Sequence, residues 1–241
     1  MKNKFIRNEL LLGEDISNKI RNLSILVVGC GGVGGYAIES LARLGVNNFT
    51  LVDNDDVDYT NFNRQIIACE QNINKSKVEA FKERILDINK DAIIDCKKVL
   101  YNKENEAFIF DKKYDFVVDA IDTLSLKWEL IKTCISNNIK FISSMGMGNK
   151  VDLTKVKITT LDKTENDPVS KKIREFARKD NINLKLIPVV FSNELPYKQN
   201  KIINENGETM KEKIPPSSII FVPATAGLLM GQYILEKTIN E

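Results

Sequence analysis

The sequence of 241 residues contains no histidine. This absence excludes Ser-His-Asp and Cys-His catalytic arrangements, histidine metal ligands and proton transfer by imidazole. The four cysteines form no CxxC pair, so no zinc site of the Cys₄ type is expected. Between Gly146 and Glu241 there is no cysteine at all, which excludes a thioester step on that segment. The cysteines are expected to be packed small hydrophobes, and only Cys30 is a candidate reactive thiol.

Neither sign of charge dominates, because 35 Lys and Arg residues stand against 33 Asp and Glu residues, for a net charge of +2. With 28% charged and 43% hydrophobic residues, this is the composition of a soluble globular protein. The amino-terminal segment has an apolar run of only three leucines, too short for the core of a signal peptide. A cytoplasmic protein with reduced cysteines is therefore expected.

One stretch, 217–235, has nineteen residues without a charge, close to the length of a membrane span. Pro223 interrupts it, and Gly227 and Gly231 follow. We therefore expect a short strand at 218–222, a break at the proline and a short buried helix, with no membrane association.

Short apolar runs alternate with helical patterns along the first two thirds of the chain. We expect strands at 24–29, 48–53, 92–99, 114–121 and 139–144. We expect helices at 33–44, 75–89 and 124–137. Strand–helix–strand alternation with continuous apolar runs predicts a doubly wound, mostly parallel, Rossmann-like sheet with helices on both faces, an α/β fold.

The pattern changes after Gly148. A strand is expected at 156–161, a basic helix from Pro168 to about Asp180 and a strand at 184–192. The polar segment 198–216 is expected to be a flexible excursion. We therefore predict a single domain over 1–241, with a nucleotide-binding core at 1–150 and a substrate-facing α/β extension at 151–241.

A glycine-rich turn follows the first predicted strand and opens the first helix. It reads Gly29-Cys-Gly31-Gly32-Val-Gly34, and Asp53 ends the next strand 19 residues later. Glycines allow a tight turn and close backbone approach, the helix N-terminus faces phosphate, and the acid binds ribose hydroxyls. The arrangement predicts a nucleotide site without choosing between NAD and ATP.

The segment after Asp53 favours ATP. It contains Asp55, Asn61 and Arg64, and Lys77 follows near the start of the next helix. An adenylating enzyme needs fixed cations of this kind, because transfer at the α-phosphorus releases pyrophosphate, whereas a dehydrogenase has no such need. Either cation alone would be interpreted as a surface charge. Together, after a glycine-rich turn, they indicate a phosphate site.

Two acids end the fourth predicted strand in the sequence Asp119-Ala-Ile-Asp122. Ligands of open parallel sheets bind beyond the carboxyl ends of the strands. Asp122 is therefore a candidate to hold Mg²⁺ that bridges ATP oxygens. Asp119 is equally compatible with a structural role at the end of the strand.

These motifs together resemble the ubiquitin-activating-enzyme-like adenylyltransferases of the ThiF/MoeB type, over about residues 5–150. The resemblance implies that Asp53 binds the ribose and that Asp122 is the catalytic acid that supports Mg²⁺ and adenylation. Arg7 matches an arginine that in this family crosses a dimer interface to the partner's ATP, so a homodimer is expected. The residues that the resemblance assigns to the phosphates are Asn61, Arg64 and Lys77.

Motifs in the second half narrow the resemblance to the tRNA threonylcarbamoyladenosine dehydratases. They are the segment 143–152, the pair Asp167-Pro168, Phe191-Ser192 before Glu194, and the segment 218–223. In that family ATP activates the carboxylate of threonylcarbamoyladenosine beside the tRNA anticodon, and ring closure expels water overall. The resemblance then covers nearly the whole chain.

Binding of tRNA requires a basic surface. Because the net charge is only +2, such a surface requires local clustering of Lys and Arg residues. In the expected helix from Pro168, Lys171, Arg174 and Arg178 share one face, and Lys172 adds charge nearby. These four residues are candidates for phosphate contacts, and a solvated amphipathic helix is the alternative.

Other functions stay open at this point. One is an adenylyltransferase that acts on the C-terminus of a sulfur-carrier protein, and another is a nucleotide-binding partner of sulfur-transfer proteins without turnover of its own. An NAD oxidoreductase is a more distant alternative.

Overall fold

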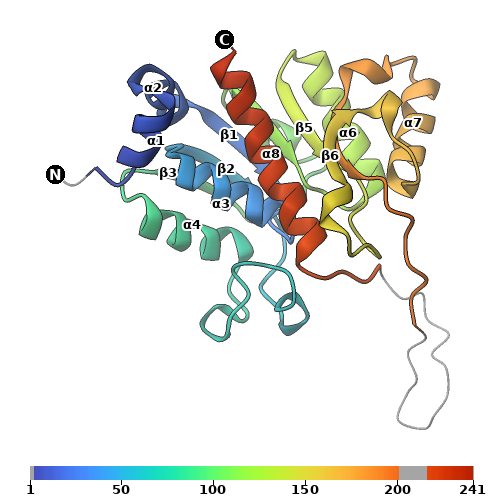
Figure 1. Ribbon diagram of the computed structural model, residues 1–241, viewed down its shortest axis with the longest axis horizontal. Coiled ribbons are helices and arrows are strands. Elements are labelled where there is room, and N and C mark those ends of the chain that lie inside the picture. Colours follow the sequence, from blue (N-terminus) through green and yellow to red (C-terminus); the bar gives the residue numbers. More distant parts are fainter. Residues whose placement is uncertain (1–2, 201–215, 241) are drawn as a thin grey trace, which may run out of the picture.

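A computed structural model describes residues 3–200 and 216–240 (Figure 1). Its seven strands form one sheet in the order β3-β2-β1-β4-β5-β7-β6. Neighbouring strands are parallel, except that β6 runs antiparallel to β7. The strands are β1 (Ser24–Val28), β2 (Asn48–Val52), β3 (Ile93–Lys97), β4 (Phe116–Asp119), β5 (Lys140–Ser144), β6 (Val156–Thr160) and β7 (Pro188–Ser192). The predicted doubly wound α/β fold is confirmed.

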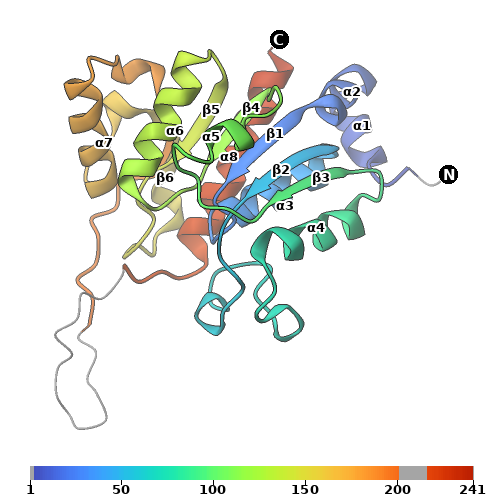
Figure 2. The ribbon, with the colours of Figure 1, turned by 180° about the vertical axis from the view of Figure 1, so that it is seen from behind.

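Helices cover both faces of this sheet (Figures 1 and 2). The helices are α1 (Ile6–Leu12), α2 (Glu14–Asn22), α3 (Gly34–Leu44), α4 (Lys77–Ile88), α5 (Glu106–Ile109), α6 (Leu124–Ser136), α7 (Pro168–Lys179) and α8 (Phe221–Ile239). One hydrophobic cluster joins β1 and β2 to α2, α3, α4 and α8, and the other joins the opposite sheet face to α5, α6 and α7. Successive strand residues face opposite sides, so β1, β2, β4, β5 and β7 contribute to both clusters, whereas β3 and β6 contribute only to the first.

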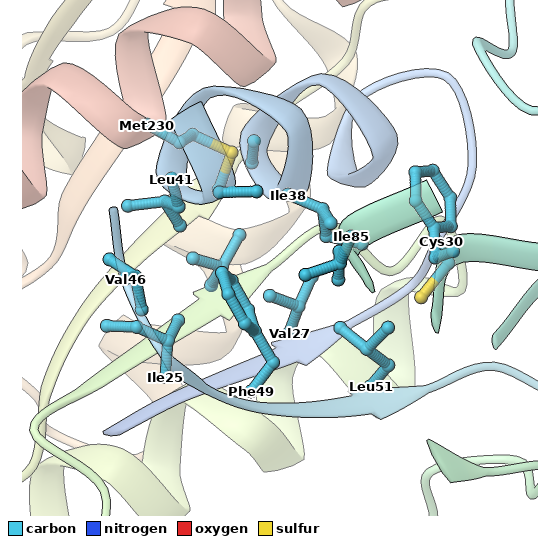
Figure 3. Packing of buried hydrophobic residues seen from close by; sticks show 14 of the residues in the cluster. Ile25, Val27, Cys30, Ile38, Leu41, Val46, Phe49, Leu51, Ile85 and Met230 are labelled. Carbon is cyan, nitrogen blue, oxygen red and sulfur yellow. The ribbon is translucent and has the colours of Figure 1, made fainter. Parts of the chain in front are cut away.

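The first cluster is closed by a contact between α3 and α8. Figure 3 shows Ile25 and Val27 of β1 below α3, with Met230 reaching in from α8. A Cβ on Gly227 would lie 2.3 Å from the carbonyl oxygen of Val33, so only glycine allows this approach of the two helices.

The carboxyl-terminal stretch differs from the prediction in two places. The segment 218–222 is no strand, because α8 begins at Phe221 and includes Pro223. A proline in the first helical turn loses no helical hydrogen bond, so Pro223 is no break. The strand expected at 184–192 begins only at Pro188, after a 3₁₀ turn at Leu184–Leu186.

The other boundaries agree with the structure to within a few residues, and α1, α2 and α5 had no prediction. Nearly all of the excursion expected at 198–216 lies outside the described residues. Within the described ranges, no helix has the length and apolar character needed to cross a membrane.

Glu39 provides a pH-dependent link between α3 and α4. Its carboxylate accepts hydrogen bonds from Arg43 Nε at 2.7 Å and from Arg84 Nε at 2.6 Å. Burial alone would raise the pKa of Glu39, but the hydrogen bonds from the two arginines lower it below its ordinary value of 4.5. Deprotonation therefore stabilises the fold, and this contribution is lost as the pH falls through the lowered pKa.

Glu39→Gln is expected to destabilise the protein by about 1–2 kcal/mol at pH 7, since hydrogen bonds to a charged group are lost. Between about pH 5 and pH 3, the free energy of unfolding of this variant should also decrease less than that of the parent protein. Urea unfolding across this range measures both effects. Glu83→Gln is the control, because Glu83 forms an exposed pair with Lys75 and should contribute little. An unchanged pH profile in Glu39→Gln would contradict the assignment.

Candidate active site at the carboxyl ends of the strands

The glycine-rich turn, the end of β2, the loop that follows it and the end of β4 line one cavity of about 510 Å³. The carboxyl ends of parallel strands meet at one edge of a sheet, which brings segments far apart in sequence together. The predicted site residues that line the cavity are Gly29, Gly31, Gly32, Asp53, Asp55, Asn61, Arg64, Lys77 and Asp122.

The turn after β1 is packed too closely for side chains at two positions. Gly29 has φ +93°, and a Cβ there would lie 2.6 Å from the carbonyl oxygen of Ala120. A Cβ on Gly34 would lie 1.8 Å from the carbonyl oxygen of Gly29, so Gly34 shapes the turn from outside the cavity lining. No side chain of the described residues caps α3 at Val33. The amides of Gly35 and Tyr36 donate to the carbonyl oxygens of Gly31 and Val33, so the positive end of the helix dipole is what the turn offers an anionic ligand.

Asp53 is fixed at the end of β2 by two backbone amides. Its Oδ2 accepts from the amide of Cys30 at 2.7 Å, and its Oδ1 accepts from the amide of Asp55 at 2.9 Å. Burial raises the pKa of Asp53, although Lys77 and these two amides act in the opposite direction. The carboxylate is therefore held rigidly beside the turn, as a ribose ligand requires.

Two of the cationic side chains that line the cavity, Lys77 and Arg64, were predicted as phosphate ligands. Lys77 Nζ lies 2.7 Å from Asp55 Oδ2, and its side chain is 6% exposed against 58% for that of Asp55. Arg64 Nη1 donates to the carbonyl oxygen of Thr60 and to Asn63 Oδ1, both at 2.9 Å. Among the described residues no carboxylate pairs with Arg64, so its charge is available to an anionic ligand such as a phosphate.

Asp122 lies three residues after the end of β4 and is exposed. Its carboxylate accepts a hydrogen bond from Thr123 Oγ1 at 3.3 Å. The described residues contain no group of three acidic or cysteine side chains that could hold a metal by themselves. One carboxylate nevertheless fits Mg²⁺, which takes one or two protein oxygens together with substrate phosphates and water.

Arg7 is not brought to the cavity of its own chain. It is exposed on α1, and its side chain makes no hydrogen bond or ion pair with the described parts of the chain. α1 lies near the far end of α3 from the glycine-rich turn, since the ring of Phe5 packs beside Gly45 (Figure 1).

The basic helix α7 also lies outside the cavity lining, apart from Val169. Lys171 and Arg178 are exposed, and Lys172 is exposed but pairs with Glu175 at 2.8 Å. Arg174, which the helical spacing places on the same face, is less accessible than the other three residues. Arg174 is half-buried and its Nη1 donates to the carbonyl and hydroxyl oxygens of Thr164.

A family model described as the ThiF family matches residues 5–238. The chain belongs to the ThiF family.

The chain resembles several known proteins in sequence and in structure. It is 41% identical over 246 residues to the tRNA threonylcarbamoyladenosine dehydratase of Bacillus subtilis, covering 100% of this chain and 96% of the relative. A crystal structure of the Escherichia coli enzyme of that name in complex with ATP superposes with a TM-score of 0.87 at 33% identity, covering 98% of this chain and 94% of that one. The adenylyltransferase and sulfurtransferase MOCS3 of Drosophila ananassae is 32% identical, over only 56% of this chain and 30% of its own.

Two residues beside the cavity of this ThiF-family chain, Lys127 and Lys150, were not predicted from the sequence. Lys127 lines the cavity from α6 and is 1% exposed, although the other buried side chains around it in the helix are mainly apolar. Lys150 is 2% exposed, and its Nζ donates to the carbonyl oxygen of Gly146 at 2.9 Å. The signal for Lys127 was its place on the apolar side of an amphipathic pattern. We find no comparable signal for Lys150.

Cys30 is completely buried beneath the turn. Burial, reinforced by the Asp53 carboxylate, raises the pKa of the Cys30 thiol well above its ordinary value of 9.0. Both observations favour the packed small hydrophobe over the reactive thiol.

Iodoacetamide at about pH 8 is therefore expected to label Cys30 in the folded protein more slowly than Cys69 by about tenfold or more. Cys69 is the internal comparison, since it is only half-buried. Peptide mass spectrometry of a time course measures both rates, and labelling under denaturing conditions should remove the difference. Equal rates in the folded protein would contradict the assignment.

Proposed function

We propose that the protein catalyses the ATP-dependent dehydration, by cyclisation, of N6-threonylcarbamoyladenosine beside the tRNA anticodon. The observation that carries this proposal is one cavity that combines an exposed acid, Asp122, with two fixed cations, Arg64 and Lys77. The full-length likeness to the Bacillus subtilis dehydratase supports the substrate. The ATP complex of the Escherichia coli enzyme supports ATP as the activating nucleotide.

In this proposal the nucleotide lies along the glycine-rich turn. Asp53 accepts hydrogen bonds from the ribose hydroxyls, and the α3 N-terminus and Asn61 face the phosphates. Arg64 and Lys77 offset the charge that develops on the departing pyrophosphate. Asp122 would hold Mg²⁺, which supplies further positive charge at the phosphates when bound.

The substrate carboxylate needs no histidine base, since a carboxylate is ionised at pH 7. It attacks the α-phosphorus, the bond to pyrophosphate breaks, and an acyl adenylate forms. The carbamoyl oxygen or nitrogen of the same substrate then attacks the activated carbonyl carbon and expels AMP. A nitrogen of the carbamoyl group loses a proton in this step, so the nucleoside loses one water in total. Holding both groups in one site makes ring closure unimolecular.

A homodimer and a tRNA-facing surface belong to the same proposal. Leu10 and Leu11 of α1 are 79% and 83% exposed, an apolar surface that a second copy of the chain would cover beside Arg7. Leu11→Glu is expected to shift sedimentation towards the monomer.

On α7, Lys171, Lys172 and Arg178 would contact tRNA phosphates. Lys171→Ala should therefore weaken tRNA binding and reduce the dependence of the tRNA affinity on salt concentration. Such an enzyme would work in the cytoplasm, where tRNA is modified, and sulfur-transfer proteins are candidate partners.

The deciding experiment incubates the purified protein with ATP, Mg²⁺ and threonylcarbamoyl-modified tRNA, followed by gentle digestion and nucleoside mass spectrometry. Loss of one water from the modified adenosine, dependent on ATP, is the expected result. Reactions without ATP, and with tRNA that lacks the modification, are the controls. An unchanged nucleoside would contradict the proposal. ATP–pyrophosphate exchange that depends on a protein ending in Gly-Gly would instead identify a sulfur-carrier substrate. Binding of a nicotinamide nucleotide would identify an oxidoreductase.

A further inference from the structure

A buried ion pair between Asp119 and Lys127 lies next to the cavity, and Asp119 is three residues before Asp122 in the sequence. Lys127 Nζ of α6 lies 2.9 Å from Asp119 Oδ1 of β4, and the two side chains are 2% and 1% exposed. The hydroxyl of Ser143, on β5, donates to Asp119 Oδ2 at 2.6 Å and is also buried. Lys127 Nζ lies 3.4 Å from the same hydroxyl. These three residues, the Asp119 cluster, tie β4 to the two elements beside it.

The Asp119 cluster also holds the backbone that carries Asp122. Asp119 Oδ1 accepts from the amide of Ile121, the residue directly before Asp122, at 3.1 Å. The Asp122 carboxylate itself is exposed, and within the described ranges its hydrogen-bond partner is the hydroxyl of Thr123. The position of Asp122 at the cavity therefore depends on the turn that Asp119 fixes.

Stability alone does not explain a buried ion pair at this place. Removing two charges from water costs several kcal/mol per ion, and apolar residues of similar volume often stabilise a core equally well or better. Lys127 lines the cavity, but Asp119 balances its charge, so the pair adds no net charge where phosphates would bind. A pair of this kind can, however, select one conformation, because the buried carboxylate must find all of its donors.

We infer that Asp119 is a positioning residue, which with Lys127 and Ser143 fixes the turn that presents Asp122 to the cavity. The expected effect on rate rests on the proposed function, whereas the effect on the turn 120–123 is independent of any substrate. Asp119 is not among the residues that line the cavity. Loosening its contacts should therefore lower kcat and leave the KM for ATP nearly unchanged.

The first test measures amide hydrogen exchange at Ile121 in the parent protein, in Ser143→Ala and in Lys127→Met. Exchange about tenfold faster in both variants is expected, because the Asp119 carboxylate that accepts from this amide loses one of its two side-chain partners in each. Ser143→Ala leaves the ion pair between Lys127 and Asp119 intact. This variant therefore still decides the test if Lys127→Met does not fold. Lys97→Met is the matched control, since Lys97 is equally buried, pairs with Asp111 at 2.8 Å and lies outside the cavity lining. Unchanged exchange in Ser143→Ala, or equal acceleration in Lys97→Met, would overturn the inference.

The second test is a double-mutant cycle with Asp122→Ala, read out as ATP-dependent water loss. Ser143→Ala is expected to lower kcat by about tenfold with the KM for ATP within about twofold, and to have no further effect once Asp122 is removed. Equal losses in both backgrounds, or a higher KM at unchanged kcat, would overturn the positioning role. If the parent protein shows no ATP-dependent water loss, the proposed function fails, while exchange at Ile121 still decides the role of Asp119.

Discussion

Asp122→Ala is expected to lower kcat for water loss by about 10²–10³-fold, the usual cost of removing one preorganised charge-stabilising group. ATP binding should change little, because the ribose acid, the turn and both cations stay in place. Initial rates from nucleoside mass spectrometry, at several ATP concentrations, separate kcat from KM.

The control for this loss is Asp87→Ala, since Asp87 is an exposed acid on α4 outside the cavity lining. It should keep the parent's rate. A large rise in the KM for ATP at unchanged kcat would contradict the catalytic role of Asp122 and make it a residue that only binds the nucleotide.

Gly34→Ala is expected to destabilise the fold by about 1–3 kcal/mol or more, because the added methyl group meets backbone that cannot move aside. The methyl carbon would lie 1.8 Å from the carbonyl oxygen of Gly29 and 3.0 Å from its carbonyl carbon. The turn should open, and ATP affinity should fall with it. Urea unfolding and titration with ATP measure the two effects.

Gly31→Ala is the matched control within the same turn. The nearest atom to its added methyl group would be Gln65 Nε2, 3.9 Å away, so the folded protein has room for it. Stability should change by less than about 0.5 kcal/mol. If Gly34→Ala proved as stable as Gly31→Ala and still bound ATP, the close packing of the turn would not be required.

The sequence predicted the sheet and most of the site because both depend on local features. Parallel strands buried on two faces appear as continuous apolar runs, which is why β1, β2, β4 and β5 were placed within a few residues. The nucleotide residues follow strand ends, and the carboxyl ends of parallel strands share one edge. Knowing the strands therefore placed Asp53 and Asp122 at one cavity.

What the sequence did not predict depends on interactions between segments that a local pattern does not contain. The apolar run 218–222 has strand-like composition, but its last two residues begin a helix that packs along α3. Arg174 has the helical spacing of a basic face, yet its long side chain reaches a loop oxygen on Thr164. Lys127 is charged and still buried, because Asp119, eight residues earlier, supplies its counterion. Each outcome depends on a partner that only the folded chain brings close.

The packing of α8 on α3 has a consequence for the order in which the chain acquires its structure during synthesis. The core beside β1 includes Ala226, Met230 and Ile234, which leave the ribosome after every strand of the sheet. Until then Ile38 and Leu41 lack part of their cover, so the nascent sheet exposes apolar surface of the kind that chaperones bind. Ribosome-bound chains that end before Phe221 should therefore be captured by such chaperones and released once α8 has emerged.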